Sequence, residues 1–137
     1  MSILDLSIVI PLYNEDESLP ELTDWISRVM DREGYTYEII FVNDGSTDNS
    51  WQVIQELRTQ NANVKAISFR RNQGKSAGLN QGFKAASGQV VITMDADLQD
   101  SPEEIPEFLP SVFLLKSLFH ANQEPQSFRI QVLLSSR

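Results

Sequence analysis

Three carboxylates and an amide follow the apolar segment Val90–Met94 in close succession, at Asp95, Asp97, Gln99 and Asp100. Carboxylates that gather at one place repel one another unless a cation lies among them. Ligand sets made only of oxygen favour hard ions such as Mg²⁺ or Mn²⁺, and such ions commonly hold substrate phosphates as well. The run therefore predicts a metal-assisted site for a nucleotide-linked substrate. The alternative is a solvated acidic loop that leads into the next helix.

The segment IPLYNE, residues 10–15, carries groups suited to holding a planar base. Pro11 fixes a bend in the chain, and Tyr13 offers a flat face and a hydroxyl. Asn14 and Glu15 add groups that can form hydrogen bonds. The spacing is equally compatible with a second interpretation, in which Asn14 caps the helix that follows and Tyr13 packs against the side of that helix.

Two further segments, VNDGSTD at residues 42–48 and FRRNQGKSAG at residues 69–78, are also polar. Asp44 could accept a hydrogen bond from a base, or it could simply belong to an Asp-Gly turn with a Ser/Thr cap. The triplet GKS at residues 74–76 is similar to the end of a P-loop, but that motif requires a glycine where Phe69 stands. A basic loop entering a helix can still approach a phosphate or ribose; a solvated turn is the alternative.

Predicted strands and helices alternate in a way that would bring these four segments together. Apolar runs predict strands at residues 6–12, 37–42, 64–69 and 90–94, and helical spacing predicts helices at residues 15–30, 48–60 and 76–86. Strands alternating with helices indicate a parallel sheet in a three-layer α/β domain. Each polar segment follows a strand, so all four are expected at the carboxyl edge of the sheet, where open α/β sheets bind ligands.

Local signals mark the ends of these helices. Ser46 or Thr47 is expected to cap the second helix, and Ser101 followed by proline and two acids predicts the start of a fourth. Glycines within the third helix would let it approach its neighbours closely.

The composition excludes several classes of function. A length of 137 residues suits one domain, and a formal net charge of −8 argues against a nucleic-acid partner. The absence of cysteine excludes disulfides and thiolate metal sites. The beginning of the chain lacks the features of a signal peptide, and no stretch approaches the roughly 20 apolar residues of a spanning helix, so no transmembrane segment is expected. No dinucleotide-binding glycine fingerprint follows the first strand.

The segment from 109 to 137 has a different composition from the rest. It carries a single acidic residue, Glu124, and the only histidine, His120, for which no catalytic role is expected. A short strand is predicted at residues 129–134. We therefore divide the chain into a part at residues 1–108 and a divergent tail at 109–137, for which an appended end, a truncated end and a shifted reading frame are all open interpretations.

Four segments together resemble the nucleotide-binding half of family-two glycosyltransferases with the GT-A fold. They are SIVIPLYNE, EIIFVNDGSTDNS, RNQGKSAGLNQGF and GQVVITMDADLQDSPEEIP, and they span residues 6–107. The DADLQD form is especially similar to the polyprenyl-phosphate sugar transferases, the group that includes dolichol-phosphate mannose synthase. The resemblance implies a Rossmann-like GT-A domain with a mainly parallel sheet, truncated after its donor-binding part.

The resemblance also implies the ligands and the residues that hold them. A UDP- or GDP-sugar donor with Mg²⁺ or Mn²⁺ is expected. The residues placed around the nucleotide are Pro11, Tyr13, Asn14, Glu15, Asp44, Gly74, Lys75, Asp95 and Ala96. The residues assigned to the metal are Asp95, Asp97 and Gln99.

For the acceptor side, the resemblance implies a polyprenyl phosphate and a cytoplasmic protein, at the cytoplasmic face of the membrane in the full-length family form. A general base for other acceptors lies further along the chain in this family, and no match to it is found here. A non-catalytic nucleotide-diphosphate-binding fragment is therefore the second hypothesis, and a nucleotidyltransferase the third. A free sheet edge after the fourth strand would also allow a homo-oligomer to form.

Overall fold

Helices and strands alternate in the computed structural model, which describes residues 3–119 and 130–133. The elements are β1 (Leu6–Leu12), α1 (Leu19–Glu33), β2 (Tyr37–Asp44), α2 (Ser50–Gln60), β3 (Val64–Phe69), α3 (Lys75–Ala85), β4 (Val90–Thr93), the short 3₁₀ helix η1 (Pro102–Glu104), α4 (Ile105–Phe119) and β5 (Ile130–Leu133). The four predicted strands are confirmed to within two residues at each end. The predicted short strand at residues 129–134 is confirmed as β5.

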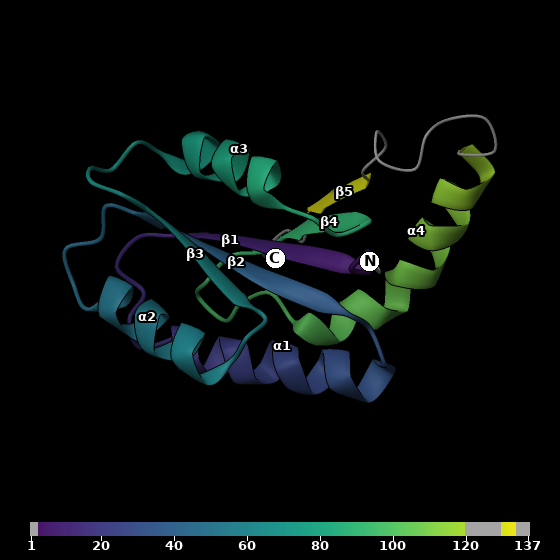
Figure 1. The fold of residues 1–137 in the computed structure, drawn as a ribbon, viewed down its shortest axis with the longest axis horizontal. Helices are drawn as coiled ribbons and strands as arrows, with labels where there is room; N and C mark the ends of the chain where they lie inside the picture. Colours follow the sequence, from purple (N-terminus) through teal and green to yellow (C-terminus); the bar gives the residue numbers. More distant parts are fainter. Residues whose placement is uncertain (1–2, 120–129, 134–137) are drawn as a thin grey trace.

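The strands form one parallel sheet in the order β3-β2-β1-β4-β5. β1 lies at the centre, where Val9 is opposite Ile40 of β2 on one side and Thr93 of β4 on the other. Figure 1 shows α1 and α2 on one face of the sheet and α3 on the other. The predicted three-layer α/β fold is confirmed.

Alternating residues of the central strands face two separate apolar cores. Ile8 and Phe41 belong to the core beneath α1 and α2, whereas Val9, Ile40 and Val42 belong to the smaller core beneath α3. All five side chains are fully buried. Helices covering both faces explain why these strands are continuous apolar runs in the sequence.

The glycines of α3 allow the close approach that the sequence predicts. A Cβ atom on Gly82 would overlap the side chain of Val9, and one on Gly78 would lie 3.4 Å from the Cβ of Pro11. α3 therefore lies directly against β1, which brings its first residues to the end of that strand.

Two of the predicted helix starts differ from the structure. α1 begins at Leu19 and not near residue 15, with Pro20 in its first turn, so the preceding residues form a loop. α2 begins after Asn49, and neither Ser46 nor Thr47 caps it. Their side chains bond instead to a residue of the loop after β1, a long-range contact that local capping rules do not include.

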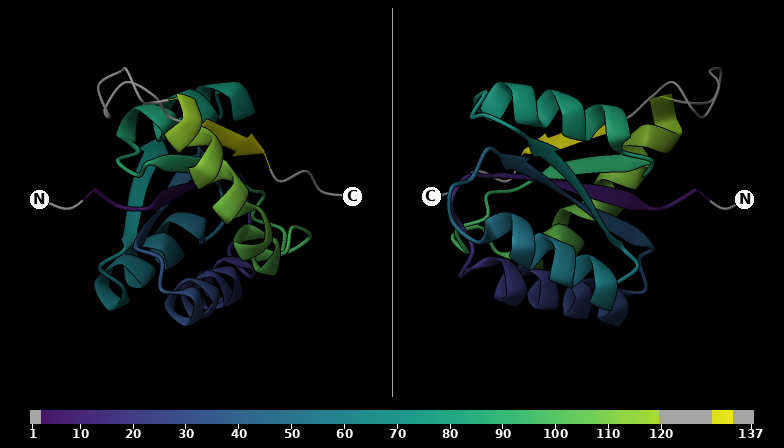
Figure 2. Two further views of the ribbon diagram at one scale, coloured as in Figure 1. Left: turned by 90° about the vertical axis from the view of Figure 1, so that its right-hand side faces the viewer. Right: turned by 60° about the vertical axis from the view of Figure 1, so that its left-hand side comes forward.

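The segment after β4 is part of the same fold. The predicted helix start at Ser101 is confirmed, because its Oγ accepts a hydrogen bond from the backbone N–H of Glu103 at 3.3 Å. α4 continues across the predicted boundary at residue 108, and Leu109 is fully buried in the core beneath α1. Figure 2 shows α4 running from the layer of α1 past the sheet towards the layer of α3.

β5 corrects the prediction of a free edge after β4. Its residues Ile130–Leu133 pair in parallel with Val90–Thr93, so the outer side of β4 is occupied by another strand. The prediction of a homo-oligomer was based on that free edge. It stays a prediction, without this argument. His120 lies outside the described residues. None of the helices in residues 3–119 combines the length and the apolar run needed to cross a bilayer.

Candidate functional site

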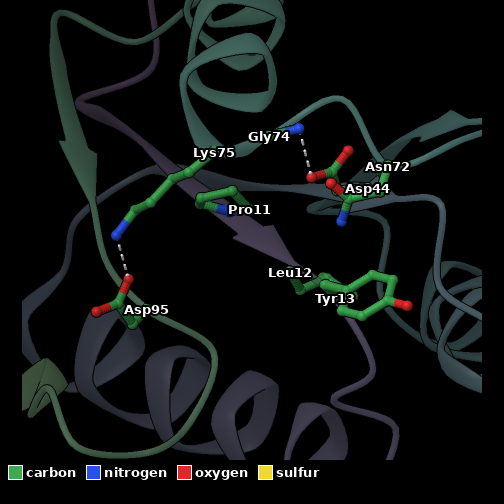
Figure 3. Close-up of a pocket in the computed structure, with 8 residues that line it drawn as sticks. All are labelled: Pro11, Leu12, Tyr13, Asp44, Asn72, Gly74, Lys75 and Asp95. Carbon is green, nitrogen blue, oxygen red and sulfur yellow. Dashed lines mark hydrogen bonds and ion pairs between the residues drawn. The ribbon is translucent and has the colours of Figure 1, made fainter.

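Two adjoining cavities lie at the carboxyl edge of the sheet. The larger, of about 300 Å³, is lined by Pro11, Leu12, Tyr13, Asp44, Asn72, Gly74, Lys75 and Asp95 (Figure 3). The smaller, of about 170 Å³, is lined by Pro11, Leu12, Tyr13, Glu15, Asp95, Ala96 and Asp97. Residues from the ends of β1, β2, β3 and β4 thus meet at one place. The predicted convergence of the four polar segments is confirmed.

The loop after β1 separates the roles of Tyr13 and Asn14. Tyr13 is 47% exposed and lines both cavities, so part of its ring is available to a ligand. Asn14 lines neither cavity. Its Oδ1 accepts from the backbone N–H of Thr47 at 2.8 Å and from that of Asp48 at 3.3 Å, and its own backbone N–H donates to Ser46 Oγ at 3.0 Å.

Asn14 therefore joins the loop after β1 to the loop after β2. Its φ of 55° lies in the left-handed region, where asparagine is one of the few side chains that are tolerated. The position before α1 is taken by Ser18, so the interpretation of Asn14 as a helix cap is wrong. Its predicted contact with a base stays a prediction, and its observed bonds are to the protein itself.

Asp44, the last residue of β2, holds the loop that follows β3. Its Oδ1 accepts from the backbone N–H of Gln73 at 2.7 Å, and its Oδ2 accepts from that of Gly74 at 3.0 Å. The residue is only 6% exposed, yet it lines the larger cavity. Each carboxylate oxygen has a second lone pair, so Asp44 keeps the capacity to accept from a ligand.

Gly45 brings the same two loops into contact. It has a φ of 72°, and a Cβ atom there would lie 2.5 Å from the backbone of both Arg71 and Asn72. The Asp-Gly pair therefore allows two backbone segments to approach each other closely, in addition to forming a turn. This approach places Asn72 in the cavity wall.

Lys75 and Asp95 form an ion pair at the cavity. Lys75 is the first residue of α3, and its Nζ lies 2.8 Å from Oδ1 of Asp95, which follows β4 (Figure 3). The two side chains are 60% and 30% exposed. Arg70, Arg71 and Asn72 are exposed, as the alternative of a solvated turn predicts. The lysine at the end of this loop nevertheless contacts the acidic run.

The acidic loop after β4 is fixed by hydrogen bonds from several sides. The backbone N–H of Asp95 donates to Asp100 Oδ2 at 3.0 Å, and that of Gln99 donates to Asp97 Oδ1 at 3.2 Å. Ser18 Oγ donates to the carbonyl of Ala96 at 2.6 Å.

Asp100 is the buried residue that binds the backbone of this loop. Only 3% of the residue is exposed. Burial raises the pKa of its carboxyl group, and the charges of Asp95 and Asp97 raise it further, against the hydrogen bond from the backbone N–H of Asp95, which lowers it. Asp100 therefore acts on the backbone of the loop and lines neither cavity.

The oxygen donors of this loop suit a divalent cation that is shared with a substrate. Within residues 3–119 and 130–133, no three His, Cys, Asp or Glu side chains already converge on a metal position. Mg²⁺ is usually bound by one or two carboxylates together with substrate phosphates and water, and Asp95 and Asp97 on the wall of the smaller cavity supply such a pair. Gln99 is exposed and lines neither cavity.

Leu12 and Asn72 line the larger cavity and were not among the predicted site residues. Leu12 is the last residue of β1, one position before Tyr13, and its apolar side chain gives no chemical signal. Asn72 lies within the basic loop, where the resemblance implied Gly74 and Lys75 as the site residues. The close approach at Gly45, which places Asn72, depends on the fold.

The model of glycosyl transferase family 2 matches residues 7–112. This chain belongs to glycosyl transferase family 2. The sequence resemblance is confirmed, and the GT-A fold with it.

One relative of this family-2 chain is the undecaprenyl-phosphate 4-deoxy-4-formamido-L-arabinose transferase of Pseudomonas fluorescens (strain SBW25). The two are 43% identical over 128 residues, which is 90% of this chain and 38% of the relative. The relative belongs to the predicted group of polyprenyl-phosphate sugar transferases, and the chain spans well under half of its length.

Two solved structures share the fold. S. aureus TarS 1-349 in complex with UDP has a TM-score of 0.62 and 21% identity, covering 82% of this chain and 32% of that one. The mannosyltransferase PcManGT from Pyrobaculum calidifontis in complex with GDP-Man and Mn²⁺ has a TM-score of 0.60 and 24% identity. The match covers 71% of this chain and 28% of that one. At these identities, the likeness concerns the fold alone.

Proposed function

We propose that this chain is the donor-binding part of a glycosyltransferase that uses a nucleotide-sugar, with a divalent cation, and a polyprenyl phosphate acceptor. The observation that carries the proposal is the larger cavity. One cavity at the carboxyl edge of the parallel sheet is lined by Tyr13 after β1, Asp44 at the end of β2, Lys75 at the start of α3 and Asp95 after β4. Family membership and the polyprenyl-phosphate relative support the choice of reaction.

In this proposal the donor extends across both cavities. The base lies beside the exposed ring of Tyr13, and its N–H groups donate to Asp44, which has unused lone pairs. The diphosphate lies towards Lys75 and the pair Asp95 and Asp97. A bound divalent cation would neutralise the negative charge that develops on the leaving diphosphate. The complexes of two fold relatives, with UDP and with GDP-Man and Mn²⁺, support this class of ligand.

The acceptor determines what else the reaction requires. A phosphate oxygen of a polyprenyl phosphate is already anionic, so it needs little help from a general base. It attacks the anomeric carbon from the face opposite the diphosphate; the new C–O bond forms as the old one breaks, and the nucleoside diphosphate leaves with the electron pair. The anomeric centre is inverted. A lipid acceptor would place the working enzyme at the cytoplasmic face of a membrane.

A non-catalytic nucleotide-diphosphate-binding module is the second candidate. It is favoured by the distribution of the candidate residues, because all of those at the two cavities lie on the donor side, between residues 11 and 97. A sugar-transfer assay with a polyprenyl phosphate separates the two. Transfer by the 137-residue chain at rates normal for the family would contradict the module, and donor binding without transfer would support it.

Calorimetric titration tests the donor site itself. We expect UDP or GDP, and their sugars, to bind in the presence of Mn²⁺ and to bind more weakly without it. Asp97→Ala should lower the affinity with Mn²⁺ by about tenfold or more, because a charge-assisted contact to the cation is lost. Asp31→Ala, at an exposed carboxylate in the last turn of α1, is the matched control and should change nothing. Binding that is indifferent both to Mn²⁺ and to Asp97→Ala would refute the donor site.

A further inference from the structure

The ion pair between Lys75 and Asp95 lies where the donor diphosphate and its cation are proposed to bind. Both residues line the larger cavity, and Asp95 also lines the smaller one. The Nζ to Oδ1 distance of 2.8 Å means that one oxygen of Asp95 is occupied by the ammonium group. Asp95 is also the carboxylate that would share a divalent cation with Asp97.

The backbones at the two ends of this ion pair are held firmly. The N–H of Gly74, directly before Lys75, donates to the buried Asp44, and the N–H of Asp95 donates to the buried Asp100. Gly74 has a φ of 98°, which glycine adopts without strain, and this conformation begins α3 at the cavity. The positions of the two backbones are therefore set independently of the bond between the side chains.

The side-chain ends of the pair are accessible to water and can separate. The exposed fractions of 60% for Lys75 and 30% for Asp95 show a pair near the surface. Such pairs contribute little to stability, because water solvates both groups when they part. A lysine side chain is long and flexible, and its ammonium can bind a phosphate as a point charge. Lys75 can therefore move from one anionic partner to another without disturbing the fold.

We infer that Lys75 holds Asp95 in the donor-free protein and exchanges it for the donor diphosphate when a divalent cation binds to Asp95. The inference rests on the proposed function and adds the role of a positioning residue. An ammonium and a dication repel each other at one carboxylate, so Lys75 disfavours the cation alone. When the diphosphate arrives with the cation, it offers the displaced ammonium new anionic oxygens. Cation and nucleotide are then bound together more favourably than either alone.

The exchange predicts effects of opposite sign in one variant. Lys75→Met keeps an unbranched side chain and removes the charge. Its affinity for Mn²⁺ alone, measured by electron paramagnetic resonance of the free ion, should rise by about two- to fivefold, the range expected on releasing a partly exposed ion pair. Its calorimetric affinity for UDP at saturating Mn²⁺ should fall by about tenfold, because a charge-assisted phosphate contact is lost.

Two further variants serve as controls. Lys75→Arg keeps the positive charge and should leave both affinities within about twofold of the wild type. Lys84→Met removes a charge from the last turn of the same helix, away from both cavities, and should change neither. Unfolding temperatures of all variants establish that the fold is retained.

The outcomes also separate this inference from the proposed function. If the wild type shows no Mn²⁺-dependent binding of UDP or GDP, the donor site and the exchange are both refuted. If the wild type binds as proposed but Lys75→Met weakens Mn²⁺ and UDP together, Lys75 merely supports the cavity wall and the exchange alone is wrong. An unchanged affinity for Mn²⁺ alone would overturn the exchange in the same way.

Discussion

Strand β2 carries one buried carboxylate near each end, and the two differ in what surrounds them. Glu38, at the amino end, is 1% exposed and binds three neighbouring segments. It accepts from Ser7 Oγ at 3.1 Å, from the backbone N–H of Ser87 at 3.1 Å and from the Ser87 hydroxyl, and it pairs with Lys65 Nζ at 2.9 Å. At the carboxyl end, Asp44 accepts two backbone N–H groups and lines a cavity.

The difference separates a structural carboxylate from a candidate functional one. Burial raises the pKa of Glu38, but its bonds to Ser87 and Lys65 outweigh that effect, so its net pKa lies below the ordinary value. The charge of Glu38 is thus balanced by partners that belong to the protein. Asp44 is distinguished instead by the cavity beside it. Burial and hydrogen bonding alone therefore do not identify a site in this molecule; unused accepting capacity beside a cavity does.

The largest expected effect is on stability, at the amino end. Glu38→Ala should lower the free energy of unfolding by about 3 kcal/mol, because the bonds to three segments are lost together. Lys65 is 54% exposed and stays solvated when Glu38 is removed. The loss of unfolding free energy is therefore expected at the lower end of the range for breaking buried ion pairs. Urea denaturation at pH 7 measures it, and nucleotide affinity should not change. A folded variant with weakened UDP binding would break the contrast between the two ends.

This effect should also depend on pH in a defined direction. Because the pKa of Glu38 is lowered in the folded protein, the stabilisation is fully present at neutral pH and is lost as the pH falls below the ordinary value of 4.5 and through the folded pKa. The difference in unfolding free energy between wild type and Glu38→Ala should therefore narrow in acid.

An intermediate effect is expected at the carboxyl end, and mainly on binding. Asp44→Asn replaces one of the two accepting oxygens by an amide nitrogen that can only donate, and this nitrogen would face the backbone N–H of Gln73 or that of Gly74. It also removes one oxygen that could accept from a base. UDP affinity in the presence of Mn²⁺ should fall by about tenfold, with a loss of unfolding free energy of about 1 kcal/mol. Calorimetry and urea denaturation of one preparation give both numbers. A stability loss as large as that of Glu38→Ala with unaltered affinity would make Asp44 a second structural carboxylate.

The smallest expected effect concerns Asp100, a buried carboxylate that lines neither cavity. Its raised pKa means that the folded protein favours the protonated form, so stability from this group is present below the ordinary value of 3.8 and is lost as the pH rises through the folded pKa. Asp100→Asn removes that penalty and keeps an oxygen for the N–H of Asp95. It should unfold at a slightly higher temperature than the wild type at pH 7, and the difference should vanish near pH 3. A lower unfolding temperature at pH 7 would contradict this account.

The fold was predictable because its signals are local and repeated. Each inner strand is a mainly apolar run, and each of the first three crossovers carries a helical pattern, so the alternation follows from the residues themselves. The same topology brings the ends of four strands to one edge, which explains why Pro11, Tyr13, Asp44 and Asp95 could be placed at one site.

The parts that were missed depend on contacts between distant residues. Ser46 and Thr47 are good caps by type, but Asn14 lies across from them and takes their hydrogen bonds. The ion pair of Lys75 with Asp95 joins residues 20 positions apart in the sequence and requires the position of α3 against β1. The pairing of β5 with β4 likewise follows from the folded sheet.

The contact at Gly45 has a consequence for engineering the proposed donor site. Because the backbone of this glycine lies against that of residues 71 and 72, the loops after β2 and β3 behave as one mechanical unit. Grafting either loop alone from another member of the family would make the two mismatched backbone segments clash. A transplant that exchanges residues 44–50 and 70–75 as a pair is the design that respects this constraint.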